Sequence, residues 1–285
     1  MQPNILDSIA SQYSSLTRSS KKLADYILTH KSETQYMSIT TLAEASCVSE
    51  ATITRFCKML GLVGYNDFKL ALAKADPTTV TGDPAVENVP GEGNDSFDGL
   101  CRRLYQADVS ALSETLALTD EASAQKAIQL LSQAKRVYCF GQGGSNIMAM
   151  EAWARFSTAS SNFIHIEDSH MQAMASSLCT KQDAILFFSY SGATKDMLDV
   201  LKPAKSNGAS IILITHFSNS PAAMLADVSL LCGPSESPLQ SGSIAAKVGQ
   251  LFIIDYLFHG FCQQNPESCT AARQATAQAT ARKLL

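Results

Sequence analysis

The amino-acid sequence predicts an α/β protein in which a small all-α helix-turn-helix domain precedes a larger domain built on a parallel β-sheet. Two observations lead to this prediction. Residues 38–60 read as two short capped helices joined by a tight turn, and from residue 136 onward short apolar runs alternate with segments of helical composition. We expect domains at 1–76 and 98–285, joined by a flexible acidic linker at 77–97 that is rich in proline and glycine.

The overall composition indicates a globular protein with a sizeable core. The chain has 285 residues, of which 46% are apolar and 17% charged, and the net charge of −4 argues against a uniformly basic nucleic-acid binder. Eight cysteines without a CxxC pair and five scattered histidines predict reduced thiols and no metal site. The first residues lack the order of a signal peptide, and polar residues interrupt the apolar segment 248–262, so we expect a cytoplasmic protein without a membrane span.

The first two predicted helices lie within residues 4–30. Their apolar positions recur at helical spacing, and Thr17 is placed to cap the second helix. A further short helix is expected at 67–75, with Tyr65 and Phe68 packed under the preceding helices. Together with residues 38–60, these helices would close a compact helical domain.

The helix-turn-helix unit is the most informative part of this half. Ser38 would cap a helix at 39–46, Ser49 a helix at 50–60, and Gly61 would end the second helix. Apolar residues of both helices can meet in one small core: Leu42, Ala43, Val48, Ile53, Phe56 and Leu60. In this layout the second helix enters the major groove of DNA.

The outer face of the second helix supplies the candidate DNA-binding residues. They are polar or basic: Ser49, Thr52, Thr54, Arg55 and Lys58. Arginine commonly reads guanine edges, whereas hydroxyls and lysine hold phosphates. A solvated helix face would carry the same residue types. Because residues 1–76 hold eight Lys and Arg against seven acids, non-specific binding per monomer should be weak, and a dimer would compensate.

The second domain begins with two expected helices, at 97–118 and 121–134. The first helix has an apolar stripe of Leu100, Leu104, Val109, Leu112 and Leu116, which fits either a domain core or a dimer interface. Strands are then expected at 137–140, 163–166, 184–188, 210–215 and 228–232, with helices at 145–160, 170–178, 194–206 and 220–226. This alternation predicts a parallel sheet covered on both faces, which binds ligands at the carboxyl ends of its strands.

Residues 189–194, with the sequence SYSGAT, form the strongest candidate ligand site. They join an apolar strand to a helix, so backbone N–H groups and the helix dipole point at one place. Ser189, Ser191 and Thr194 add hydroxyl donors, and Gly192 allows close approach to the backbone. Because no Walker-type motif occurs, a small phosphorylated molecule fits better than a nucleoside triphosphate. An ordinary turn between a strand and a helix could also have this composition.

A second turn follows the first expected strand. Its sequence, GQGGSN at 141–146, matches a dinucleotide-binding GxGxxG only loosely because Ile147 replaces the third glycine. A cradle for a phosphate and a sugar fits this shorter turn better. No cofactor is indicated.

The order of these motifs resembles the RpiR (MurR/RpiR) family of bacterial transcriptional regulators. The similar stretches are residues 16–28, 48–61, 189–196 and 250–257. The resemblance implies a helix-turn-helix head and a flavodoxin-like αβα sugar isomerase (SIS) domain that binds a phosphosugar and adjusts operator binding. It implies a phosphate at Ser189, Ser191 and Thr194, and a sugar lined by Gly143, Gly144 and Ser145, with Asp168 and His170 contributing polar groups. Where the family usually has glycine in the turn of the head, this chain has Cys47, so mild backbone strain is expected there.

Two other functions remain open from the sequence. SIS folds also include sugar-phosphate isomerases, and Glu151, Glu167, Asp168, His170 and Glu236 could supply a catalytic base. A fused DNA-binding head argues against catalysis, because a sensor gains nothing by consuming its signal. Alternatively, the protein could be a scaffold without catalysis or DNA binding, whose helical head only dimerises. For the regulator we expect a homo-oligomer, either a dimer or a tetramer. The sequence leaves open the sugar, the operator and the sign of regulation.

Overall fold

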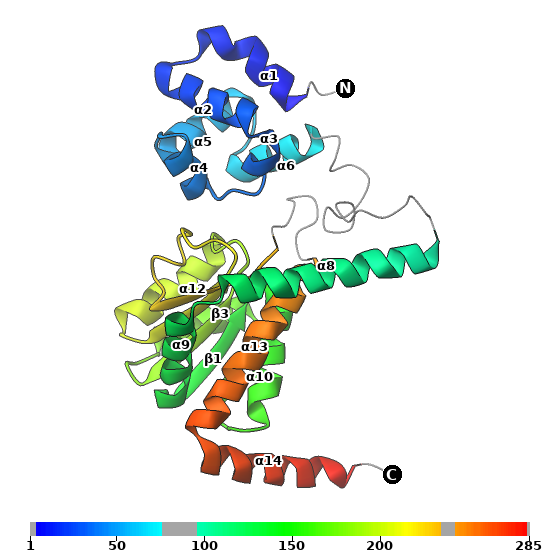
Figure 1. The fold of residues 1–285 in the computed structure, drawn as a ribbon. Helices are drawn as coiled ribbons and strands as arrows, with labels where there is room; N and C mark the ends of the chain where they lie inside the picture. Colours follow the sequence, from blue (N-terminus) through cyan, green and yellow to red (C-terminus); the bar gives the residue numbers. More distant parts are fainter. Residues whose placement is uncertain (1–3, 76–95, 235–242, 284–285) are drawn as a thin grey trace. The chain divides into compact units, whose positions relative to one another are not determined.

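The computed structural model describes residues 4–75, 96–234 and 243–283, and it contains two compact units, which are considered separately (Figure 1). Apart from Ser96 and Phe97, the predicted linker at 77–97 lies outside the described residues. Within the described ranges, no helix combines the length and apolarity that a membrane span requires.

The first unit is a bundle of short helices. Its elements are α1 (Ile5–Gln12), a 3-10 turn (Tyr13–Ser15), α2 (Arg18–Thr29), α3 (Lys31–Thr34), α4 (Ile39–Ala45), α5 (Glu50–Met59) and α6 (Tyr65–Ala75). One apolar core joins them, with Leu23, Ile27, Leu42, Phe56 and Phe68 fully buried. The helix-turn-helix core predicted from the sequence is therefore confirmed.

Three predicted helix caps in this unit are present. The hydroxyl oxygens of Thr17, Ser38 and Ser49 accept hydrogen bonds from backbone N–H groups three residues further on, at 3.3, 3.0 and 3.2 Å. Each cap satisfies a donor that the first helical turn leaves unpaired. Gly61 ends α5 with a φ of 82°, and Cys47 has a φ of 52°, the left-handed conformation expected at that turn.

The second unit is a three-layer α/β domain. Its elements are α8 (Phe97–Leu118) from Asp108 onward, α9 (Glu121–Gln133), β1 (Arg136–Gly141), α10 (Gly144–Ser157), β2 (Phe163–His165), α11 (Ser169–Ser177), β3 (Asp183–Phe188), α12 (Lys195–Ser206), β4 (Ser210–Thr215), β5 (Val228–Leu231), α13 (Ile244–Gln264) and α14 (Pro266–Ala281). The five strands are parallel in the order β2-β1-β3-β4-β5, the flavodoxin-like arrangement.

Both faces of the sheet are buried, as predicted. In β3, Ala184, Leu186 and Phe188 pack with α9, α10 and α13, while Ile185 and Phe187 pack with α12. Figure 1 shows α10 and α13 crossing one face of the sheet. Because side chains alternate between two covered faces, the strands read as continuous apolar runs.

The amino-terminal ends of β1 and β3 are joined by an ion pair. Arg136 donates two hydrogen bonds, of 2.8 and 3.0 Å, to the carboxylate of the buried Asp183. Burial acts to raise the pKa of Asp183, but the bonds from Arg136 and Thr180 outweigh it and lower the pKa below 3.8. The carboxylate is therefore ionised at neutral pH.

Two features of this unit were not predicted correctly. The helix expected at 220–226 is absent, and the segment forms successive turns held by bonds such as that from the Ala226 N–H to the Ala222 carbonyl. The segment has room for only about two helical turns before the Asp227 N–H bonds to the Ile211 carbonyl at the entry to β5, and so short a helix gains little against the cost of nucleation. Helix α14 was not predicted from the sequence, because its exposed face is polar and its apolar periodicity is weak.

Candidate functional site

The candidate ligand site lies where the strand order reverses, at the carboxyl ends of β1 and β3. The last residues of these strands, Gly141 and Phe188, are register partners. The turns that follow them therefore start side by side. Successive connections leave this point in opposite directions across the sheet, which opens a crevice where ligands of such folds bind.

The turn after β3 is held in place by the end of β4. The Tyr190 carbonyl accepts two hydrogen bonds of 3.0 Å, one from the hydroxyl of Thr215 and one from the backbone N–H of His216. The Tyr190 ring stacks on His216, with centroids 5.1 Å apart, and its hydroxyl donates to the Pro234 carbonyl at 2.6 Å. These contacts fix the turn before any ligand binds.

The serines of this turn bond to its own backbone. The Gly192 N–H donates to Ser189 Oγ at 3.2 Å, and the Ala193 N–H donates to Ser191 Oγ at 3.3 Å. Ser189 is buried, whereas Ser191 and Thr194 are exposed. Thr194 occupies the N-cap position of α12 without making a side-chain cap bond. The turn thus presents hydroxyls and the positive end of a helix dipole at one exposed place.

Gly192 is required by both backbone conformation and space. Its φ is 58°, and a Cβ added there would come within 2.1 Å of Ser220 Oγ and 2.5 Å of Ser220 Cβ. Real side chains do not pack this closely. The turn consequently accepts only glycine without rearrangement.

The turn after β1 also depends on glycine. Gly143 is the N-cap of α10 with φ 55° and ψ −129°, and the N–H groups of Ser145 and Asn146 bond back to Gln142 and Gly143 at 3.1 Å. Gly143 and Gly144 are exposed, and Ser145 is half-buried. A backbone left open in this way can approach a ligand closely.

A cavity of about 470 Å³ lies beside these turns. Its described lining comes from the β1 turn, from the start of α11 and from the first turn of α12: Gln142, Gly143, Glu167, Asp168, Ser169 and Asp196. Of the predicted ligand residues, Gly143 and Asp168 line this cavity, and the remaining ones are not part of its described lining. Asp168 also caps α11, accepting the Met171 N–H at 2.9 Å, and His170 is exposed on the same helix.

Four residues of this lining were not predicted as ligand residues. Both side-chain amide atoms of Gln142 are buried and have no hydrogen-bond partner within the described residues, which marks this side chain as available to a ligand. The carboxylates of Glu167 and Asp196 and the hydroxyl of Ser169 add acceptors. The position of Gln142 between glycines was the one sequence signal that could have indicated it.

The predicted DNA-binding residues lie together on α5 and at its cap. Ser49, Arg55 and Lys58 are exposed, and Thr52 and Thr54 are half-buried. One Arg55 nitrogen donates to Thr52 Oγ1 at 3.3 Å, and Thr54 Oγ1 donates to the Glu50 carbonyl at 3.0 Å. Helix α5 therefore offers a polar outer surface with two unburied cations.

Comparison with known proteins gives matches along most of the chain. Residues 3–78 match the helix-turn-helix domain of the rpiR family, and residues 130–260 match the SIS domain. The chain is 30% identical to an HTH-type transcriptional regulator of Haemophilus influenzae over 96% of this chain and 95% of that protein. It is 29% identical to the regulator HexR of Escherichia coli, over 90% and 88% of the two chains.

A solved structure resembles the whole chain. NanR of Vibrio vulnificus, in complex with ManNAc-6P, superposes with a TM-score of 0.88 at 29% identity and covers 99% of both chains. Sequence and structure thus agree on both domains and on their order. The protein belongs to the rpiR family of HTH-type transcriptional regulators, in which a helix-turn-helix domain is joined to an SIS domain.

Proposed function

We propose that this regulator senses a phosphorylated sugar at the carboxyl ends of β1 and β3 and changes its affinity for an operator in response. The observation that carries the proposal is the adjacency of two glycine-dependent turns at the strand-order reversal. NanR of Vibrio vulnificus, which is similar over its whole length, was solved with a sugar phosphate bound. That similarity supports the same class of ligand here.

The phosphate would lie at the turn after β3. Ser189, Ser191 and Thr194 would donate hydroxyl hydrogens, and the start of α12 would contribute backbone N–H groups. Gly192 would hold the turn in the conformation that presents these groups. The carboxylates of the neighbouring cavity would repel a phosphate. This repulsion favours the turn over the cavity as the phosphate position.

The sugar would extend from the turn towards the cavity. Carboxylates accept hydrogen bonds, so Asp168 and its acidic neighbours would bind sugar hydroxyls, and the unpartnered amide of Gln142 would bind a further polar group. Gly143, Gly144 and Ser145 would line the opposite side, with His170 at the rim. A ligand with an anionic end and a hydroxyl-rich end fits this distribution of charge.

The DNA would be read by α5. Arg55, already aligned by Thr52, would contact a base edge or a phosphate, and Ser49, Thr52, Thr54 and Lys58 would contact the backbone or neighbouring bases. The binding unit would be a homo-oligomer with at least two heads. Its interface would include the α8 stripe, because Leu112 and Leu116 are 39% and 62% exposed in the single chain.

We further infer that the SIS domain does not turn over its ligand. Glu151, Glu167, Asp168 and His170 are exposed to solvent, whereas catalytic sites usually exclude water. Glu236 lies outside the described residues. The named relatives are transcriptional regulators. Regulation would follow from a different affinity of the sugar phosphate for two arrangements of the heads.

Thermal unfolding against a panel of sugar phosphates, each beside its unphosphorylated sugar, tests the ligand class. A ligand that binds only the folded state raises the melting temperature by mass action. We expect a rise with one sugar phosphate and none with its parent sugar. Equal responses to both members of every pair would contradict a phosphate-binding turn.

A charge introduced at Ser191 tests the position of the site. Ser191→Glu places a carboxylate where the phosphate would lie and should abolish the thermal response while preserving DNA binding. Ser161→Glu, which adds the same charge at an exposed position before β2, is the matched control and should respond like the wild type. A normal response of the Ser191→Glu variant would exclude this turn as the effector site.

A further inference from the structure

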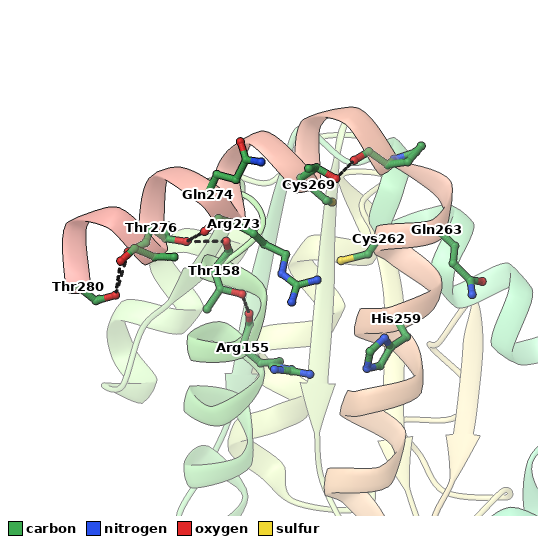
Figure 2. Close-up of a pocket in the computed structure, with 13 residues that line it drawn as sticks. Arg155, Thr158, His259, Cys262, Gln263, Cys269, Arg273, Gln274, Thr276 and Thr280 are labelled. Atoms are coloured by element: carbon green, nitrogen blue, oxygen red, sulfur yellow. Dashed lines mark hydrogen bonds between the residues drawn. The ribbon is translucent and has the colours of Figure 1, made fainter.

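A second, larger cavity lies at the opposite end of the sheet, where α14 packs against the ends of α10 and α13. Its volume is about 850 Å³, within the range of small-molecule sites. Figure 2 shows the side chains that line it, including Arg155 of α10, His259 of α13 and Arg273 of α14. The turns after β1 and β3 are at the other edge, because α10 starts at the carboxyl end of β1 and finishes at this cavity.

The lining of this cavity is basic. Arg155 and Arg273 project into the space between the three helices (Figure 2). No carboxylate is found among the lining side chains that the structure describes. The cavity therefore has the opposite charge to the acidic one beside the β1 and β3 turns.

The two arginines differ in how their charge is balanced. Arg155 donates to Asp255 at 3.1 Å, and its guanidinium lies 4.2 Å from the centroid of the Phe258 ring. His259 Nε2 is 3.5 Å from the same Asp255 oxygen. In the described part of the chain, the guanidinium of Arg273 has no hydrogen-bond or ion-pair partner. The cavity is thus lined by Arg155, which is held by Asp255 and Phe258, and by Arg273, whose charge is not balanced by a carboxylate of the described residues.

The two guanidinium groups face the same cavity. Arg155, at the end of α10, and Arg273, on α14, both line it (Figure 2). The thiols of Cys262 and Cys269 also line it, and burial raises the pKa of Cys262, so that this thiol adds no negative charge at neutral pH. An oxyanion in the cavity can therefore form charge-assisted hydrogen bonds with the arginine side chains.

We propose that this cavity is a second anion-binding site, which takes a small organic anion carrying carboxylate or phosphate groups. Arg273 and Arg155 hold the anionic group, and the side-chain amides of Gln263 and Gln274 bind further polar groups. Pro266 and Ala277 contribute apolar wall. The site is independent of the sugar-phosphate site at the other edge of the sheet.

Binding at this cavity would attach α14 more firmly to the domain. In the structure Thr276 of α14 donates one hydrogen bond of 3.0 Å to the Thr158 carbonyl at the end of α10. An anion held between Arg155 and Arg273 adds a bridge between the same two helices. Slower amide exchange in α14 is the direct signature of that bridge.

Hydrogen exchange of the full-length protein tests the proposal, with inorganic phosphate and citrate as probes against chloride at equal ionic strength. We expect one probe to slow exchange across 266–281 in the wild type. Arg273→Gln should raise the probe concentration needed for half of the effect by about tenfold or more. Arg282→Gln, which removes the same charge from an exposed position near the end of α14, should behave like the wild type.

Two further variants keep the test decisive. Gln274→Glu adds a negative charge to the lining and should weaken the probe's effect as Arg273→Gln does. Ser191→Glu, at the other site, should leave it unchanged. Absence of protection with either probe would overturn the proposal. Equal responses of the Arg273→Gln and Arg282→Gln variants would also overturn it, since they would mean general charge screening.

Discussion

Replacing Gly192 with alanine tests how tightly the turn after β3 is built. The substitution forces alanine into a left-handed conformation at a φ of 58°, which costs about 1–2 kcal/mol. It also places a Cβ 2.1 Å from Ser220 Oγ, and relieving such crowding costs about 1–3 kcal/mol more. We therefore expect the free energy of unfolding to fall by about 2–5 kcal/mol.

Gly208→Ala is the matched control. Gly208 has a φ of 84°, but an added Cβ would lie 3.6 Å from Lys181 Cβ, an ordinary contact. Only the backbone cost of about 1–2 kcal/mol should then appear. Urea unfolding followed by the fluorescence of Trp153, the single tryptophan, reports on the domain that holds both glycines.

A double-mutant cycle isolates the crowding. In a Ser220→Gly background the two nearest atoms are gone, so Gly192→Ala should cost about 1–3 kcal/mol less than in the wild type. The Gly192→Ala variant should also lose its thermal response to the sugar phosphate, whereas Gly208→Ala keeps it. Equal destabilisation by the two alanine variants, with the response retained in both, would refute this account of the turn.

Three further predictions concern other parts of the molecule. Arg55→Ala should weaken specific DNA binding by about 1–3 kcal/mol, measured by fluorescence anisotropy. Arg18→Ala, which removes another exposed arginine of the same domain, is the control. Equal affinities of the two variants would contradict a role of Arg55 in recognition. Leu116→Glu should shift the protein from oligomer to monomer in sedimentation velocity with an unchanged circular dichroism spectrum, and an intact oligomer would exclude this part of α8 from the interface. Arg136→Met should lower stability at pH 7 by about 2 kcal/mol, less than the ~3–5 of a fully buried pair, because the Arg136 side chain is 43% exposed. The folded-state pKa of Asp183 is lowered, so the stability that its carboxylate contributes is present above pH 3.8 and is lost as the pH falls through the folded-state pKa. The loss of stability in Arg136→Met should therefore shrink in unfolding curves measured at acid pH. A loss of stability independent of pH would contradict the ion-pair assignment.

The sequence predicted local features that depend on one or two residues. The caps at Thr17, Ser38 and Ser49 were predictable because the first backbone N–H groups of a helix have no acceptor within the helix. A hydroxyl on the residue just before the helix can accept from one of them. The parallel sheet was predictable from strands apolar on both faces. The helix expected at 220–226 was wrong although its composition suits a helix, because the chain must enter β5 directly after this short segment.

Features that depend on tertiary register could not be predicted. The pairing of Gly141 with Phe188 places the two turns side by side, and only the strand order establishes that pairing. Gln142 and Asp196, 54 positions apart in the numbering, line one cavity for the same reason. The roles proposed for the predicted ligand and DNA-binding residues stay predictions until the variants are measured.

The central claim is that a sugar phosphate changes DNA binding through the turn after β3. Its most direct test is the affinity for a labelled operator, measured by fluorescence anisotropy with and without the sugar phosphate that raises the melting temperature. The account predicts a change of about fivefold or more for the wild type and none for Ser191→Glu. An identical affinity with and without a sugar phosphate that demonstrably binds would contradict it.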